Sequence, residues 1–177
     1  MELFDLSTKE MLAGLEDDKL DVAVTVGQQS GTRGRTRTPL VRAPWQLAVN
    51  RSHPLAQRAR ITPAQVAREP LLVFCQRDYP EYWDILTGWL RDHRQRLQIA
   101  GEYDGADSLM AAAESGLGVA VVTTQTADRM PKRVQLKKLS AAPEPLCVAA
   151  GHRANRGDDK PLAVFIAELR KAAPALA

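Results

Sequence analysis

The chain has 177 residues, of which 45% are hydrophobic and 25% are charged. This composition is typical of a globular protein that buries a core in one domain or in two small lobes. The net charge of +3 is too small to indicate a nucleic-acid-binding surface, and two cysteines cannot form a metal site alone. Since no apolar run approaches about 18 residues and no secretion signal is present, we expect a cytoplasmic protein without a membrane partner.

Residues 2–26 are predicted to form a strand, a sharp turn, a helix and a second strand. Ser7 and Glu10 have the S-x-x-E spacing of a capping box, and Val22–Val24 is an apolar run typical of a buried strand. Such a turn places free N–H groups and the positive end of a helix dipole where an anionic ligand can bind. Taken alone, the motif more often marks a capped helix without a ligand.

Residues 27–40 are rich in Gly, Ser and Thr and contain Arg33, Arg35 and Arg37. We expect a flexible, solvated basic loop, with a phosphate or acidic-partner contact as the alternative. Residues 45–49 alternate between apolar and polar side chains and are predicted to form a strand.

A second capping box, Thr62 to Gln65 with Pro63 at the first helical position, predicts a short helix. A buried strand is expected at residues 71–75, and an amphipathic helix over 81–93. Asp159 is predicted to cap a last helix, in which Pro161 lies just inside the start.

Residues 99–123 repeat the order of the first unit, with Gly116 and Gly118 between the helix and its following strand. Residues 128–145 read as an edge strand and connector, followed by a strand from residue 145 to 150. The repeated order predicts two α/β lobes whose strand ends and helix starts face a common cleft.

Motifs for phosphate binding, nucleophilic catalysis and metal binding are absent from the sequence. Cys75 and Cys147 lie in apolar runs and are expected to be buried, inert thiols, and His53 is expected to be structural. We therefore predict no catalytic residues, no metal and no cofactor. An enzyme would need a buried acid/base pair, for which Asp104 with Tyr82 is the best candidate.

Four segments together carry a family resemblance: LSTKEMLAGLEDDKLDVAVTVG, WQLAVNRSHPLA, ITPAQVAREPLLVF and DSLMAAAESGLGVAVV. In this order and spacing they resemble the effector-binding domain of LysR-type transcriptional regulators. The resemblance implies an α/β fold of two Rossmann-like lobes, like type 2 periplasmic binding proteins, with an inducer in the inter-lobe cleft. By that pattern, residues 1–70 plus 146–177 would form lobe I and residues 71–145 would form lobe II.

The sequence is most similar to the subgroup that senses aromatic-degradation intermediates of the benzoate, muconate or chlorocatechol type. This resemblance implies that the effector, a small molecule with a carboxylate, contacts six residues: Ser7, Thr8, Pro80, Glu81, Tyr82 and Leu146. Glu81 departs from the subgroup, because an acid would repel an anionic effector unless it points away or pairs with Arg77.

Family members begin with a winged helix-turn-helix, a linker helix, and the first strand and helix of lobe I, which have no counterpart here. Lobe I is therefore expected to be incomplete, with unpaired strand edges unless another chain fills them. The resemblance implies an antiparallel homodimer, a tetramer in a full-length protein, and DNA contact only through the absent helix-turn-helix. A stand-alone small-molecule-binding protein of the same fold is the alternative.

Overall fold

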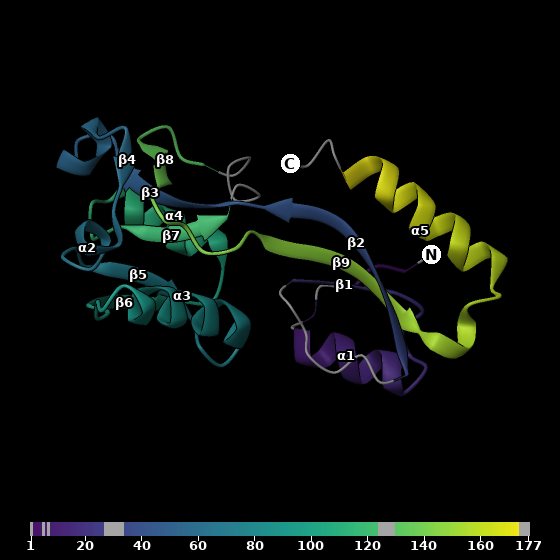
Figure 1. Ribbon diagram of the computed structural model, residues 1–177. Helices are drawn as coiled ribbons and strands as arrows, with labels where there is room; N and C mark the ends of the chain where they lie inside the picture. Colours follow the sequence, from purple (N-terminus) through teal and green to yellow (C-terminus); the bar gives the residue numbers. More distant parts are fainter. Residues whose placement is uncertain (1, 5, 7, 27–33, 124–129, 174–177) are drawn as a thin grey trace. The chain divides into compact units, whose positions relative to one another are not determined.

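The computed structural model describes residues 2–4, 6, 8–26, 34–123 and 130–173 (Figure 1). The chain divides into two compact units, Met1–Ala43 with Leu146–Ala177 (unit 1) and Pro44–Pro145 (unit 2). Strand β3 (Trp45–Asn50) forms its hydrogen bonds with strands of unit 2, so residues 44–70 belong to that unit. The lobes expected from the family pattern, residues 1–70 plus 146–177 and residues 71–145, stay a prediction.

In its described residues, unit 1 has an antiparallel sheet of three strands in the order β1-β9-β2 and two α-helices. Its elements are α1 (Thr8–Glu16), β1 (Ala23–Val26), β2 (Arg35–Ala43), β9 (Leu146–Arg153), the 3-10 turn η3 (Ala154–Arg156) and α5 (Lys160–Ala172). On the α5 side the core contains Ala150 of β9 with Leu162 and Ile166 of α5. The helix at residue 8 and the strand at residue 23 agree with the predicted pattern.

Strand β2 covers residues 35–40 of the basic loop that was expected over residues 27–40. Arg37 lies within this strand, and its Nη2 donates to the carbonyl oxygen of Cys147 at 3.3 Å. Strand β2 lies at the edge of the sheet, and its pairing register with β9 shifts between Pro39 and Val41. Proline has no backbone N–H to donate, and this is tolerated on edge strands and at bulges. The loop prediction was therefore wrong for residues 35–40, while Arg33 lies outside the described residues.

The start of the chain differs from the expected strand. Glu2–Phe4 and Leu6 have no strand assignment, although α1 begins at Thr8 close to the predicted turn. The predicted capping box depends on Ser7, which lies outside the described residues.

Helix α5 begins at the predicted cap. A side-chain oxygen of Asp159 accepts a hydrogen bond from the Leu162 amide at 3.1 Å, and its other oxygen accepts from Arg156 at 2.5 Å. Arg156 also pairs with Asp21. The Leu162 amide, followed by the Arg156 guanidinium, lowers the pKa of Asp159 below its usual 3.8.

This cap predicts a specific dependence of stability on pH. Because the folded-state pKa of Asp159 is lowered, its contribution is complete above the unfolded value of 3.8 and is lost as pH falls through the folded value. In Asp159→Asn the amide oxygen still caps the helix, so the free energy of unfolding should decline less steeply below pH 3.8 than in the wild type. Urea denaturation from about pH 5 to pH 2 measures both slopes; equal slopes would exclude Asp159 as a source of acid sensitivity.

Unit 2 contains a sheet in the order β4-β8-β3-β7 and a parallel pair, β5 with β6. A parallel bridge between Leu71 and Val119 connects the two sets. Besides β3, its strands are β4 (Arg60–Ile61), β5 (Leu71–Phe74), β6 (Ile99–Tyr103), β7 (Ala120–Thr123) and β8 (Val134–Leu139). Its helices are the 3-10 turn η1 (Pro54–Gln57), α2 (Pro63–Val66), α3 (Pro80–Asp92) and α4 (Ala106–Glu114).

The core of unit 2 forms where α4 packs against the sheet. Leu109 and Met110 of α4 are buried together with Leu72 of β5 and Val122 of β7. The predicted capping box at α2 is confirmed, because the side chains of Thr62 and Gln65 each accept from the backbone N–H of the other.

Candidate functional site

In unit 2, the carboxyl ends of two parallel strands lead toward two helix starts. Strand β5 ends at Phe74 and α3 begins at Pro80, while β6 ends at Tyr103 and α4 begins at Ala106. In α/β sheets, ligands bind outside the carboxyl ends of parallel strands, where helix N-termini supply free N–H groups. This edge of unit 2 is therefore the first candidate site.

Hydrogen bonds hold the two strand ends and the start of α3 together. The Cys75 amide donates to the Tyr103 carbonyl at 2.8 Å, and the Tyr79 hydroxyl donates to the Asp104 carbonyl at 3.1 Å. The indole Nε1 of Trp83 donates to the Phe74 carbonyl at 2.6 Å. These bonds fix the first turn of α3 against the end of β5, which gives its side chains defined positions.

Tyr82 is the predicted site residue whose environment is most unusual. Its side chain is 7% exposed and lies among aromatic rings, with centroids 5.1 Å from Phe74 in an edge-on arrangement and 5.9 Å from Trp45. Its hydroxyl is buried and makes no hydrogen bond within the described part of the chain. Burial raises the pKa of Tyr82 well above its usual 10, so the hydroxyl stays protonated and can donate to an acceptor.

The neighbouring predicted residues lie in the same first turn of α3. Pro80 is exposed and Glu81 is half-buried. Arg77, which was considered as a partner for Glu81, donates through Nε and Nη2 to the two carboxylate oxygens of Asp78, at 3.0 and 3.1 Å. This bidentate pair raises the pKa of Arg77 and lowers that of Asp78.

The other predicted site residues belong to unit 1. Thr8 is the first residue of α1 and is half-buried, and Leu146 is the first residue of β9, where it pairs with Ala43. Ser7 lies outside the described residues.

The acid/base pair that an enzyme would need is not formed. The hydroxyl of Tyr82 makes no hydrogen bond among the described residues, and the exposed Asp104 accepts from the Ser108 hydroxyl at 3.3 Å at the start of α4. Asp104 is therefore an exposed side chain that directly precedes Gly105, the N-cap of α4.

The cysteine prediction was wrong in burial, whereas His53 has the expected structural role. Cys75 and Cys147 are half-buried free thiols; Cys75 directly follows the last residue of β5, and Cys147 is the second residue of β9. Nδ1 of His53 accepts from the Leu55 amide at 3.2 Å, and Nε2 lies 3.4 Å from a Glu69 carboxylate oxygen.

Within the described ranges, no group of three or more His, Cys, Asp or Glu side chains could hold a metal ion. In the same ranges, no helix is long and apolar enough to cross a membrane.

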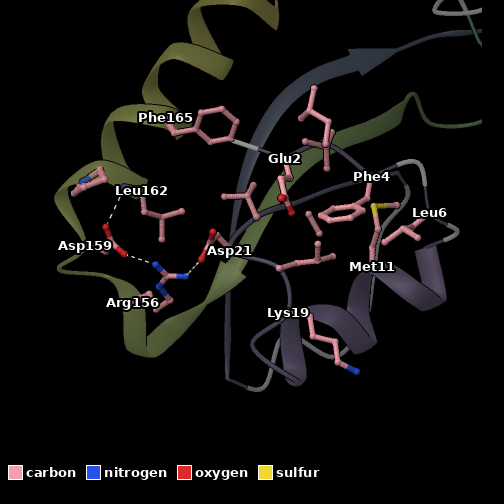
Figure 2. A pocket seen from close by; sticks show the side chains of 16 residues that line it. Glu2, Phe4, Leu6, Met11, Lys19, Asp21, Arg156, Asp159, Leu162 and Phe165 are labelled. Atoms are coloured by element: carbon pink, nitrogen blue, oxygen red, sulfur yellow. Dashed lines mark hydrogen bonds and ion pairs between the residues drawn. The ribbon is translucent and has the colours of Figure 1, made fainter.

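Unit 1 contains a groove of about 820 Å³ that the sequence did not predict (Figure 2). Phe4 and Met11 lie on one side, and Leu162 and Phe165 of α5 lie on the other. The remaining lining residues are Glu2, Leu3, Leu6, Lys19, Leu20, Asp21, Val22, Ala23, Val24, Arg156, Asp159 and Pro161. The sequence predicts the helix of the first unit and a last helix capped by Asp159, but neither prediction indicates a groove.

Comparison with known proteins identifies the fold and the family. A family model described as "LysR substrate binding domain" matches residues 1–174. An uncharacterized HTH-type transcriptional regulator of Escherichia coli K12, YnfL, is 24% identical over 139 residues, which are 78% of this chain and 45% of that protein. The chain thus spans about half the length of the curated relative that it matches.

Solved structures have the same fold. The effector-binding domain of QuiR in complex with shikimate superposes with a TM-score of 0.81 at 13% identity, covering 98% of this chain and 81% of that one. Full-length CbnR in complex with its target DNA has a TM-score of 0.82 at 16% identity, covering 97% of this chain and 59% of that one. The predicted two-lobed α/β fold is therefore confirmed.

YnfL and CbnR are named as transcription regulators, which agrees with the prediction that the chain is not an enzyme. The family model covers nearly the whole chain, with its α/β elements in both units. This chain belongs to the LysR substrate-binding domain family.

Proposed function

We propose that the chain is the effector-sensing domain of a LysR-type transcriptional regulator and that its effector is a small molecule with a carboxylate group. The observation that carries the proposal is the Tyr82 hydroxyl, a buried donor without an acceptor in the described chain, at the start of α3. A buried hydroxyl that is left unsatisfied costs about 1–3 kcal/mol. A carboxylate acceptor on the effector would remove that cost.

The surroundings of Tyr82 favour an effector with an apolar or aromatic body. Phe74 and Trp45 contact the tyrosine ring, and the N-terminal turns of α3 and α4 follow the adjacent strand ends. An aromatic wall with a few donors is typical of sites for small ring-shaped acids. This chemistry supports the aromatic-degradation subgroup that the sequence resembles, and Pro80 and Glu81 are proposed as further effector contacts.

From the family resemblance, we include Ser7, Thr8 and Leu146 among the proposed effector contacts. Replacing Thr8 tests these contacts most directly, because the Thr8 hydroxyl would donate a hydrogen bond to the carboxylate of the effector. In Thr8→Val the volume is retained and the donor is lost. We expect at least a tenfold loss of affinity, equivalent to about 1.4 kcal/mol.

Thermal-shift assays with benzoate, muconate and shikimate test this expectation. A ligand that binds the folded chain raises the melting temperature by mass action, and Thr8→Val should remove most of that rise. Thr36→Val, at an exposed position of β2, is the matched control and should retain it. If Thr8→Val responds like the wild type, Thr8 is not an effector contact; if no acid raises the melting temperature, the carboxylate assignment fails.

We further propose that the domain acts within a homodimeric regulator, pairing antiparallel, and that DNA is contacted through a helix-turn-helix outside this sequence. The curated relative, named as an HTH-type regulator, is about twice as long as the region matched here, which supports the proposal. The alternative is a stand-alone binder of the same fold. Coding sequence for a helix-turn-helix in the same reading frame would favour the regulator.

A further inference from the structure

Trp45 contacts two parts of unit 2 that lie far apart in the sequence. Its ring packs against Tyr82, with centroids 5.9 Å apart, and its indole Nε1 donates to the Glu144 carbonyl at 3.0 Å. The residue is only 3% exposed, and a buried indole N–H needs an acceptor. Trp45 therefore joins the proposed effector site around Tyr82 to the segment that precedes β9.

This segment belongs to the second of the two connections between the units. The chain passes from unit 1 to unit 2 after Ala43 and returns after Pro145. Residues 141–145, the connector, lie directly before the return and belong to no helix or strand. Trp45 follows the first crossing and Glu144 precedes the second, so one side chain holds both connections.

The connector is stiff around the carbonyl that Trp45 holds. Glu144 lies between Pro143 and Pro145. Proline fixes its own φ and confines the residue before it to extended conformations, so Glu144 has little freedom to absorb a displacement of its carbonyl. A change at this carbonyl is therefore passed on to Leu146, the first residue of β9.

A second tryptophan holds the other end of the connector. Nε1 of Trp89 donates to the Ala141 carbonyl at 2.5 Å. Ala141 has a φ of 50°, a left-handed conformation that its Cβ disfavours and that surrounding contacts must maintain. Among the described residues, the ring contact of Trp89 is with His93, at a centroid distance of 6.0 Å. Trp89 thus anchors the connector independently of Tyr82, whereas Trp45 is the attachment that the effector site can influence.

We propose that Trp45 couples the effector site to the connector: an acceptor bound at the Tyr82 hydroxyl fixes the Tyr82 ring and thereby the indole on Glu144. The coupling rests on the proposed function, because it is a response of the same site. It requires two arrangements that the bound molecule shifts: the Glu144 carbonyl bonded to the indole, and the same carbonyl released to water. Binding favours the bonded arrangement, because an indole packed on an already ordered ring loses less conformational entropy. Trp45 is thus a positioning residue, which acts through Tyr82.

Isotope-edited NMR of the indole N–H groups tests the coupling on the wild-type chain, which has three tryptophans. Benzoate, muconate and shikimate are the probes, and Trp45→Phe and Trp89→Phe assign the resonances. A saturating acid should slow solvent exchange of the Trp45 N–H by about threefold or more, while exchange of the Trp89 N–H stays unchanged. Amide hydrogen exchange of the connector, followed by mass spectrometry, should slow in parallel.

Trp45→Phe separates coupling from binding. It keeps an aromatic ring against Tyr82 and removes the donor to Glu144. Affinity for the acid, measured by calorimetric titration, should stay within about threefold of the wild-type value, yet the acid should no longer slow amide exchange in the connector. Trp89→Phe is the matched control, since it also removes one indole bond to the connector but should retain the response to the acid.

Four results would overturn the proposal. If the acid binds to the wild type but leaves exchange of the Trp45 indole and of the connector unchanged, the site is not coupled to the connector, and the effector assignment stands. If Trp45→Phe keeps the response, another contact carries the coupling. If Trp89→Phe loses the response as well, the connector depends on any indole bond and not on Trp45. If none of the acids binds to the folded wild-type chain, the carboxylate assignment fails and the coupling fails with it.

Discussion

Replacing Gly118 with alanine is expected to lower the free energy of unfolding by about 2–3 kcal/mol. A Cβ at this position would lie 2.3 Å from the carbonyl oxygen of Pro70 and 3.2 Å from Cγ of Leu72. That carbonyl accepts from the Val119 amide at 3.0 Å, and the Leu72 amide donates to the Val119 carbonyl at 2.9 Å. Because the obstacle is paired backbone, the alanine must displace the junction between β5 and β7.

Gly105→Ala is the matched control for this prediction. Gly105 is the N-cap of α4 with φ of −157°, and an added Cβ would meet nothing within 4 Å. Its effect should stay within about 0.5 kcal/mol in urea denaturation. Comparable losses in both variants would show that the close approach at Pro70 does not limit stability.

Tyr82→Phe is expected to stabilise the unliganded chain and to weaken effector binding. The substitution removes a buried hydroxyl that has no partner among the described residues, while it keeps the ring contacts with Phe74 and Trp45. The unfolding free energy should rise by about 1 kcal/mol, since the desolvation cost of the hydroxyl disappears. Affinity for a carboxylate effector should fall at least tenfold, because the lost donor is replaced by C–H.

Tyr79→Phe is the control that shows whether the gain in stability expected for Tyr82→Phe is specific to the Tyr82 hydroxyl. The Tyr79 hydroxyl donates to the Asp104 carbonyl at 3.1 Å, so its removal should lower stability, opposite in sign to the effect at Tyr82. Urea denaturation and calorimetric titration of both variants measure the two effects. A less stable Tyr82→Phe would mean that its hydroxyl is satisfied in the folded chain and is not reserved for a ligand.

The helices that were predicted correctly from the sequence are specified by residues that lie close together in the chain. The capping box of Thr62 and Gln65, the Asp159 cap and the apolar stripe of α3 each act within a few residues, so their positions could be read directly. The predicted helix over 81–93 and the observed Pro80–Asp92 differ by one residue at each end.

The errors came from long-range pairing. Residues 35–40 have the composition of a loop, yet β2 forms because β9, more than a hundred positions later, offers its backbone edge. Long-range pairing also places residues 44–70 in unit 2, because β3 forms its hydrogen bonds with β7 and β8. Strand partners are set by tertiary context, which local composition does not contain.

The candidate site was predictable only in part. Tyr82 was selected from the family pattern, but its buried hydroxyl depends on Phe74 and Trp45, which lie 8 and 37 positions away in the sequence. The groove in unit 1 depends on α5, Phe4 and β1 together, which belong to both ends of the chain. That these segments line one groove can be recognised only once the strand pairing of unit 1 is known.

Isothermal titration of the chain with an aromatic carboxylate and with its uncharged primary amide tests the central claim most directly. We expect saturable binding of the acid, with affinity at least tenfold above that of the amide, because a carboxylate accepts a stronger hydrogen bond from the Tyr82 hydroxyl than an amide does. Binding of the acid should weaken in Tyr82→Phe. Equal affinity for acid and amide, or equal affinity of Tyr82→Phe and wild type for the acid, would contradict the assignment of a carboxylate effector to this site.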